Sequence, residues 1–324
     1  MRPPAFWSDP GAIVGRLLAP LGWLYQEVTR QRLAGATPWR APVPVVCVGN
    51  LTAGGSGKTP VARDLAARLL RAGKAPHVLS RGYGGRATGP LRVDPAFHGA
   101  AEVGDEPLLL ARDAPAWIAA DRAAGARAIA AAGGGTIVLD DGLQNPTLAQ
   151  DLRIVVIDGE SGFGNGRGIP AGPLRERVDR GLARADAVVL IGDDRGSVAP
   201  RVPPGKPVLR ARIEPRMPGA LAGVRVLGFA GIGRPEKFRA TLAAAGAEIA
   251  AFRAFADHHP FGARELARMA ADAERMGAML VTTEKDQVRL PPDWRGRVRA
   301  VPVVVRWEDE RAVDALLAGL GRGG

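Results

Sequence analysis

The stretch from Val45 to Leu70 constrains this chain more than any other. It begins as a strand of β-branched residues (Val45–Val48), continues as a glycine-rich loop, and ends as a helical run with Val61, Leu65 and Leu69 on one side. A glycine-rich loop between a strand and a helix places backbone N–H groups and the positive end of a helix dipole around phosphate groups. The sequence therefore predicts a phosphate loop that binds a nucleotide, formed by Thr52, Gly54, Gly55, Ser56, Gly57, Lys58 and Thr59.

Two side chains of this loop carry the chemistry. Lys58 can reach the outer phosphates, and the Thr59 hydroxyl can ligate Mg²⁺. The three glycines at positions 54, 55 and 57 allow the backbone to turn inward, because no Cβ blocks the required dihedrals. The usual pattern begins with glycine where this chain has Thr52, so a plain glycine- and serine-rich turn is the alternative. The position of Gly-Lys-Thr between strand and helix favours the phosphate loop.

Composition narrows the class of protein. The 324 residues are enough for two domains, and a hydrophobic fraction of 46% can fill a sizeable core. One cysteine, Cys47, allows no internal disulfide and indicates a reducing compartment. The net charge of +11 favours an anionic partner, unless it only reflects an arginine-rich composition. The arginines are scattered and aromatic residues make up only 5%, so we expect no nucleic-acid partner.

The N-terminal segment, residues 1–35, predicts an amphipathic helix. It is not a membrane-spanning helix, because Arg16, Pro20 and Glu27 interrupt the apolar run. Such a helix can lie in a membrane surface. The alternative is a helix packed on the protein core and kinked at Pro20. The apolar residues that share one side are Val14, Leu17, Leu18, Leu21, Leu24, Tyr25 and Val28.

Three further stretches follow strands and are expected at the same edge of a parallel sheet, where open α/β proteins bind ligands. Thr136–Asp141 reads as a buried strand that ends in two aspartates, a pattern typical of a Walker B element that holds Mg²⁺. An ordinary turn is the alternative. Ser80–Gly85 is a glycine cluster after a strand at 76–80, or a flexible turn. In Gly104–Pro107, Asp105 is either an N-cap or one of two carboxylates that face the nucleotide.

The rest of the chain predicts a long loop over 162–177 that is either functional or disordered, two strands at 187–191 and 208–213, and a boundary at 214–222. We expect a phosphate-loop core over 36–215 and a smaller α/β unit over 216–324, with strands at 224–230, 248–255, 278–282 and 299–305. Ala256–Pro260 is either a surface turn or a catalytic loop. Thr283–Asp286 closes the strand at 278–282, and a solvated charged turn is the alternative interpretation.

Taken together, these motifs resemble the tetraacyldisaccharide 4′-kinase family. The resemblance runs from the N-terminal helix almost to the C-terminus, and one departure is Asn145, where the family often has histidine. The threonine at the first position of the phosphate loop is similar to what the family carries. The matching stretches are Val48–Pro60, Ser80–Gly84, Gly104–Pro107, Asp140–Gln144, Pro170–Glu176, Asp257–His258 and Thr283–Asp286.

The resemblance implies a P-loop NTPase-like parallel sheet with a second, smaller α/β domain. It implies ATP-dependent transfer of the γ-phosphate to the 4′-hydroxyl of a tetraacyldisaccharide 1-phosphate, which forms lipid IVA in lipid A biosynthesis. Asp105 would be the base and His258 its partner. The lipid acceptor implies a peripheral position on the cytoplasmic face of the inner membrane. Mg²⁺ would be held by Thr59, Asp140, Asp141 and Glu106, and the substrate contacted by Tyr83, Arg122 and Arg175.

The main alternative is a nucleotide-driven switch or partition ATPase, whose loops also read Gly-Gly-x-Gly-Lys-Thr. Many of these proteins have lysine at the second loop position, where this chain has Ala53. A GTP-binding module usually has Asn-Lys-x-Asp, of which Thr283–Asp286 is only a partial echo. Transfer of labelled γ-phosphate to a lipid, rather than its release as free phosphate, distinguishes the kinase from both.

Overall fold

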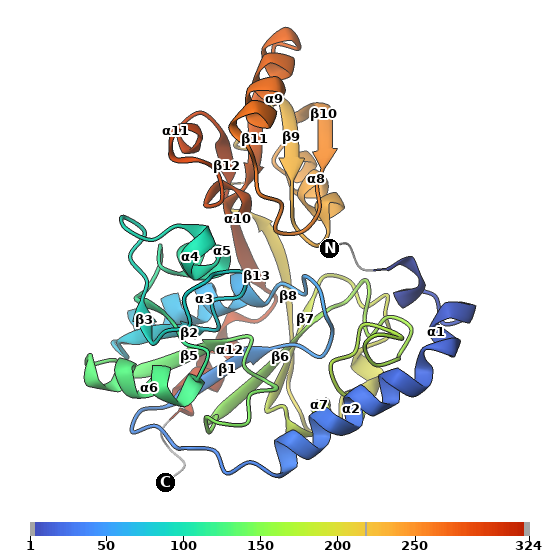
Figure 1. Cartoon of the computed structure of the whole chain (residues 1–324), viewed down its shortest axis with the longest axis vertical. Helices are drawn as coiled ribbons and strands as arrows, with labels where there is room; N and C mark the ends of the chain where they lie inside the picture. Colours follow the sequence, from blue (N-terminus) through green and yellow to red (C-terminus); the bar gives the residue numbers. More distant parts are fainter. Residues whose placement is uncertain (1–3, 218, 321–324) are drawn as a thin grey trace.

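The structure is a computed structural model that describes residues 4–217 and 219–320. It contains two sheets, a nine-stranded one in the order β13-β8-β7-β6-β1-β5-β2-β4-β3 and a four-stranded one in the order β10-β9-β11-β12. Figure 1 shows the smaller sheet and its helices at one end of the molecule, above the larger sheet. This arrangement confirms the predicted α/β class, with a large parallel-dominated sheet and a second, smaller sheet.

The large sheet contains the phosphate-loop strand β1 near its centre. β1 pairs in parallel with β5 on one side and with β6 on the other. Only the β3–β4 and β8–β13 pairs are antiparallel among the ladders of this sheet. Its strands are Val45–Gly49 (β1), Pro76–Ser80 (β2), Leu91–Arg92 (β3), Ala116–Ile118 (β4), Thr136–Asp140 (β5), Leu152–Asp158 (β6), Ala187–Ile191 (β7), Val208–Pro215 (β8) and Val303–Trp307 (β13).

Helices cover both faces of this sheet, which explains why its central strands are apolar throughout. Successive residues of β1 alternate between the two cores: Val46 and Val48 pack with the helix that follows the phosphate loop, and Val45 and Cys47 pack on the other face. The first face is covered by α3 (Lys58–Arg71), α5 (Asp105–Leu110) and α12 (Glu310–Ala318), and the second by α6 (Arg122–Ala131) and α7 (Val178–Arg184). Two short helices, α4 (Ala100–Val103) and η2 (Ala199–Arg201), complete this part.

The N-terminal segment forms η1 (Ala5–Trp7), α1 (Ile13–Leu17) and α2 (Ala19–Ala34), which run along the edge of the molecule (Figure 1). The break lies at Leu18 rather than at Pro20, where the alternative of a core-packed helix placed the kink, because proline fits the first turn of α2 without losing a hydrogen bond. No helix among residues 4–217 and 219–320 is long and apolar enough to cross a membrane.

The helix pair turns its glycines, not its large apolar side chains, toward the protein. Gly15 and Gly22 are buried, and a Cβ on Gly22 would lie 2.6 Å from the Gly168 carbonyl oxygen of the 162–177 loop. Leu17, by contrast, is 75% exposed. We call the exposed apolar residues on the outer side the apolar stripe; they are Ile13, Val14, Leu17, Leu21, Leu24, Tyr25 and Val28.

The four-stranded sheet is entirely parallel and carries its own two small cores. Its strands are Arg225–Ala230 (β9), Glu248–Ala254 (β10), Met279–Thr283 (β11) and Arg299–Val301 (β12). Its helices are Pro235–Ala244 (α8), Ala263–Arg275 (α9), Glu284–Gln287 (α10) and Pro292–Arg295 (α11). We call residues 219–302 the small unit and the remaining described residues the large unit.

The single strand expected over 299–305 is wrong. The structure has two strands in two sheets: β12 ends at Val301, and β13 pairs antiparallel with β8 of the large sheet. Pro302 separates them because it has no N–H to continue the ladder, and its carbonyl accepts a hydrogen bond from Arg216 N at 2.9 Å. The last strand and helix of the expected 216–324 unit therefore belong to the large sheet. The boundaries expected at residues 35 and 215 stay predictions, and Pro218 of the expected boundary lies outside the described residues.

The glycine contact of α2 gives a test of how the helix is held. Gly22→Ala should lower the melting temperature, because the new methyl group collides with the backbone at Gly168, at a cost of about 1–3 kcal/mol. In a free helix the same change stabilises by about 1 kcal/mol, so the sign of the effect is diagnostic. Leu21→Ala on the outer side of the same helix is the control and should leave the melting temperature unchanged. A Gly22→Ala protein that melts higher than the wild type would mean that α2 is not packed on this loop.

Candidate functional site

The phosphate loop leaves the carboxyl end of β1 and enters α3, whose N-cap is Gly57. Gly54 and Gly57 have φ angles of 112° and 91°, which only glycine adopts readily. A Cβ on Gly57 would also lie 2.8 Å from Ile213 Cδ1. Gly55 has no positive φ and open space around it, so the expected conformational need for glycine holds at two of the three positions.

Side chains behind the loop fix its path. Asn50 Nδ2 donates to the Thr52 carbonyl at 2.6 Å and to the buried Ser56 hydroxyl at 3.1 Å. Thr52 forms a β-bridge with Leu174, and Ala53 N donates to the Pro173 carbonyl at 2.8 Å. The 162–177 loop, expected to be functional or disordered, is thus ordered against both the phosphate loop and α2.

The two aspartates after β5 have different surroundings. Asp141, with a φ of 57°, accepts a hydrogen bond from Arg175 at 2.7 Å and lies 3.8 Å from Lys58 Nζ. Burial opposes ionisation of Asp141, but the charges of Lys58 and Arg175 prevail and hold its pKa below the ordinary value. In this structure Asp141 is therefore engaged by two cations rather than turned to a metal.

Asp140 fits a magnesium ion better. Its Oδ2 lies 3.4 Å from the Thr59 hydroxyl, and its buried Oδ1 has no hydrogen-bond partner. Burial, and next the negative charge of Glu106, raise the pKa of Asp140 to about 7. An orphaned carboxylate oxygen beside a threonine hydroxyl suits a hard cation with oxygen ligands. The described residues contain no group of three acidic, histidine or cysteine side chains placed to hold a metal, so phosphate oxygens and water would supply the other ligands.

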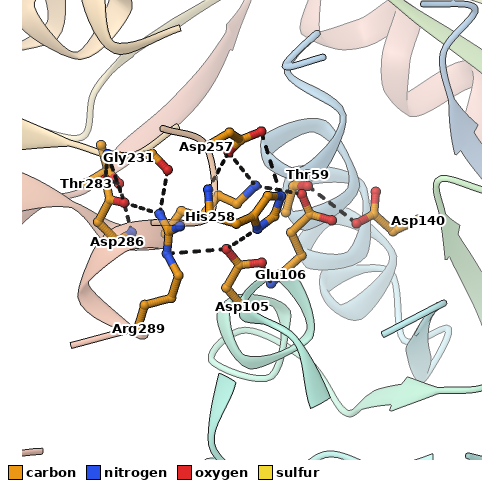
Figure 2. A network of polar contacts seen from close by, with 11 residues as sticks. Thr59, Asp105, Glu106, Asp140, Gly231, Asp257, His258, Thr283, Asp286 and Arg289 are labelled. Carbon is orange, nitrogen blue, oxygen red and sulfur yellow. Dashed lines mark hydrogen bonds and ion pairs between the residues drawn. The ribbon is translucent and has the colours of Figure 1, made fainter. Parts of the chain in front are cut away.

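Asp105 and His258 meet across the two units (Figure 2). His258 Nδ1 lies 2.9 Å from Asp105 Oδ2, and the Asp105 side chain is 2% exposed. Asp105 is the first residue of α5 and not its N-cap, which is Gly104; its Oδ1 accepts from Glu106 N at 2.9 Å. His258 has a φ of 59°, in the left-handed region that residues other than glycine rarely adopt. The loop at 256–260 is thus part of a polar site and not an ordinary surface turn.

Cations from the small unit keep the Asp105 carboxylate charged. Burial alone would raise its pKa, but the hydrogen bond with His258 and the positive charges of Lys285 and Arg289 lower the pKa below its ordinary value. Arg289 Nε lies 3.5 Å from Asp105 Oδ2. Asp105 is therefore ionised at neutral pH and able to accept a proton.

The motif at 283–286 is not a solvated turn. Asp286 is fully buried and accepts hydrogen bonds from Gly231 N, from the Thr283 hydroxyl at 2.7 Å and from Arg289. Lys285 Nζ lies 3.0 Å from Glu106 Oε1, so Glu106 is paired as well. Figure 2 shows Arg289 between Asp286 and Asp105. Sequence reasoning missed the roles of Lys285 and Arg289; the only signal was charge next to a strand end.

A second set of contacts joins the small unit to the phosphate loop. Asp158, at the end of β6, is buried and pairs with Arg234 at 3.1 Å and with Lys237. A Cβ on Gly233 would lie 3.4 Å from Gly55 N. The start of α8 therefore sits directly against the loop, a contact that no sequence pattern indicated.

The three predicted substrate residues are not brought into one cluster. Tyr83 is 66% exposed, with its ring centroid 5.6 Å from that of His258. Arg122 is buried and donates to the Ala119 and Ala120 carbonyls, while its Nε has no partner. Arg175 bonds Asp141, as described above. Tyr83 alone lies open at the edge of the Asp105–His258 contact.

The contrast between the two aspartates predicts opposite stability effects in the nucleotide-free protein. A carboxyl with a raised pKa destabilises the fold above that pKa, and the cost falls as the pH drops toward the unfolded value. Asp140→Asn should therefore raise the melting temperature by a few degrees at pH 8, and by less at pH 5. Asp141→Asn is the matched control: it removes a carboxyl with a lowered pKa and should lower the melting temperature at pH 8. The same sign for both variants would contradict the assigned surroundings.

Comparisons with known proteins point in one direction. The family model described as Tetraacyldisaccharide-1-P 4'-kinase matches residues 14–321. Proteins named tetraacyldisaccharide 4'-kinase are 58% identical in Rhodospirillum centenum and 56% identical in Gluconacetobacter diazotrophicus, covering 99% and 98% of this chain and 97% of each relative. The crystal structure of LpxK from Aquifex aeolicus in complex with ATP is 29% identical, with a TM-score of 0.75, over 94% of this chain and 99% of that one.

Proposed function

The chain belongs to the tetraacyldisaccharide 4′-kinase family, and from this premise we propose which of its residues carry out the reaction. It is an ATP-dependent kinase of lipid A biosynthesis that transfers the γ-phosphate to the 4′-hydroxyl of a tetraacyldisaccharide 1-phosphate, forming lipid IVA. None of the comparisons favours a switch or partition ATPase. The contact between Asp105 and His258, beside the phosphate loop, carries the assignment of roles.

The phosphate loop is proposed to hold ATP. Backbone N–H groups of residues 54–59 and the N-terminus of α3 face the phosphates, and Lys58 neutralises charge on the outer ones. When ATP binds, Lys58 exchanges part of its attraction to Asp141 for the phosphates. Thr59 and Asp140 would hold Mg²⁺, with Asp141 and Glu106 in its surroundings. The bound ion would supply neutralisation of the negative charge on the phosphate oxygens.

Asp105 is proposed as the base. The oxygen of the 4′-hydroxyl attacks the γ-phosphorus, the bond from that phosphorus to the bridging oxygen of ADP breaks, and the hydroxyl proton passes to Asp105. The lowered pKa of Asp105 keeps the carboxylate ready at neutral pH. His258, hydrogen-bonded to Asp105 Oδ2, orients the carboxylate and shares the proton.

The acceptor is proposed to enter beside Tyr83. This side chain is exposed next to His258, and its loop is held in place because Gly104 packs against the Tyr83 carbonyl. Arg175 could transfer its contact from Asp141 to a phosphate. Arg122, whose Nε has no partner, remains a candidate for a substrate contact at the carboxyl end of β4.

The paired roles predict non-additive losses of turnover. Asp105→Ala should cost about a hundredfold or more, His258→Ala a similar or smaller factor, and the double variant little beyond the worse single. ATP affinity should change much less than turnover, because neither residue belongs to the phosphate loop. Turnover is measured as transfer of labelled γ-phosphate to the lipid acceptor, and ATP affinity is measured by equilibrium binding.

A neighbouring histidine provides the control. His259 lies next to His258 in the chain but pairs with Glu265 at 2.8 Å, away from Asp105. His259→Ala should keep turnover near the wild-type value. Losses that multiply in the Asp105–His258 double variant would argue against a shared role, and a large loss of ATP binding with Asp105→Ala would move this residue to the metal site.

We further propose that the apolar stripe of α1 and α2 lies in the cytoplasmic surface of the inner membrane. The stripe is exposed although its residues are large and apolar, which is unfavourable in water alone. The acceptor of the reaction is a lipid, so binding of the stripe to a membrane would bring the kinase to its substrate. The net charge of +11 attracts anionic headgroups. These features support peripheral binding of the kinase at its substrate's membrane.

Vesicle sedimentation tests this position. The triple change Leu17→Glu, Leu21→Glu and Leu24→Glu should release the protein from vesicles that contain an anionic phospholipid, and wild-type binding should weaken with salt. Leu70→Glu with Phe97→Glu is the control, since both residues are exposed but lie outside the stripe. Unchanged sedimentation of a folded triple variant would show that the stripe does not bind the membrane.

A further inference from the structure

A groove with an excess of positive charge lies at the junction of the two units. It has a volume of about 710 Å³, within the usual range for small-ligand sites. We call it the arginine groove. Its arginines come from four separate segments: the end of α5, the connection after β8, the end of α11, and β12 with the turn before it. They are Arg112, Arg216, Arg295, Arg297 and Arg299.

The positive charges of this groove are only partly balanced by the protein. Glu284 is the one carboxylate that lines it, and Glu284 is engaged by Arg63 at 3.0 Å. Within residues 4–217 and 219–320, none of the five arginines forms an ion pair; Arg112 bonds Gln287, and Arg297 stacks on Trp294. A concave surface of one sign attracts ions of the other sign.

We propose that the arginine groove is a second anion site, which binds a soluble compound with two or more linked phosphate groups. Guanidinium groups match phosphate oxygens with paired hydrogen bonds, and a groove lined by several of them suits a polyvalent anion better than a single carboxylate. The site is separate from the phosphate loop. Glu284 and Gln287 of α10 line the groove, while Lys285 and Arg289 contact the Glu106 and Asp105 carboxylates.

The groove lies between the two units, so a bound anion would affect how they are held together. Arg112 belongs to the large unit, whereas Arg295, Arg297 and Arg299 belong to the small one. An anion bound between them would join the two units next to α10, and so favour the arrangement in which His258 and Arg289 reach Asp105. In Figure 1, α11 and β12 lie on the upper left and α1 and α2 along the lower right side, and this separation favours a soluble anion over a lipid headgroup.

Calorimetric titration with inorganic triphosphate tests the site without any turnover. The background is Lys58→Ala, which weakens binding at the phosphate loop. We expect saturable binding that weakens by about tenfold or more in Arg216→Gln with Arg299→Gln, because both guanidinium groups can form charge-assisted hydrogen bonds with phosphate oxygens. Neither side chain has a polar partner or ring contact in the described part of the chain, so both variants should fold.

The matched control is Arg264→Gln with Arg268→Gln, two arginines that line another open pocket, in the small unit. This change should alter triphosphate affinity less than twofold. Absence of saturable binding, or equal losses in the control, would overturn the proposal. Vesicle sedimentation distinguishes the source of phosphate: a soluble anion predicts that Arg216→Gln with Arg299→Gln leaves binding to anionic vesicles unchanged. A loss of vesicle binding equal to that of the apolar-stripe variant would assign the groove to lipid headgroups and overturn the soluble source.

Discussion

The buried contact between Asp105 and His258 is the interaction on which the rest of the site depends. A carboxylate that is 2% exposed is costly unless cations and hydrogen bonds compensate for lost water. The large unit supplies the carboxylate on α5, and the small unit supplies His258, Lys285 and Arg289. The Asp105 carboxylate, the proposed base, is therefore charged, oriented and shielded from water only when the two units are together. Its readiness to accept a proton depends on how the units dock.

The same division of charge recurs across the junction. Two carboxylates of the large unit pair with cations of the small unit. Half-buried Glu106 pairs with Lys285, and buried Asp158 pairs with Arg234 and Lys237. Among the described residues, the pair of Glu284 with Arg63 is the one that has its carboxylate in the small unit and its cation in the large unit. Removing one member of such a pair leaves the other charge buried without compensation. The pairs therefore favour one arrangement of the two units over others. The arginine groove beside α10 differs from these contacts, because none of its five arginines forms an ion pair within the described residues.

Local pattern was enough to predict the elements that carry the phosphate loop. β1, β2, β5 and β7 lie within a residue of their expected ranges, because apolar runs bounded by glycine, proline or aspartate leave few alternatives. The pairing of Asp105 with His258 was expected only through the family resemblance, since 153 residues separate them. The split of the strand at Pro302 and the burial of Asp286 escaped prediction, because both depend on which sheet or partner the segment meets.

The 162–177 loop connects the N-terminal helices to the phosphate loop. α2 touches the 162–177 loop through Gly22 and Gly168, and the same loop bonds the phosphate loop through Pro173 and Leu174. Both contacts are made by backbone rather than by flexible side chains, so the loop holds the helix and the phosphate loop at a fixed separation. Because the apolar stripe points away from that loop, a membrane bound at the stripe would be held in a fixed relation to the phosphates of ATP. Under this proposal the lipid acceptor would have to move from the membrane toward Asp105. The exposed Tyr83, whose ring lies beside His258, is then better placed to contact the acceptor than the buried Arg122.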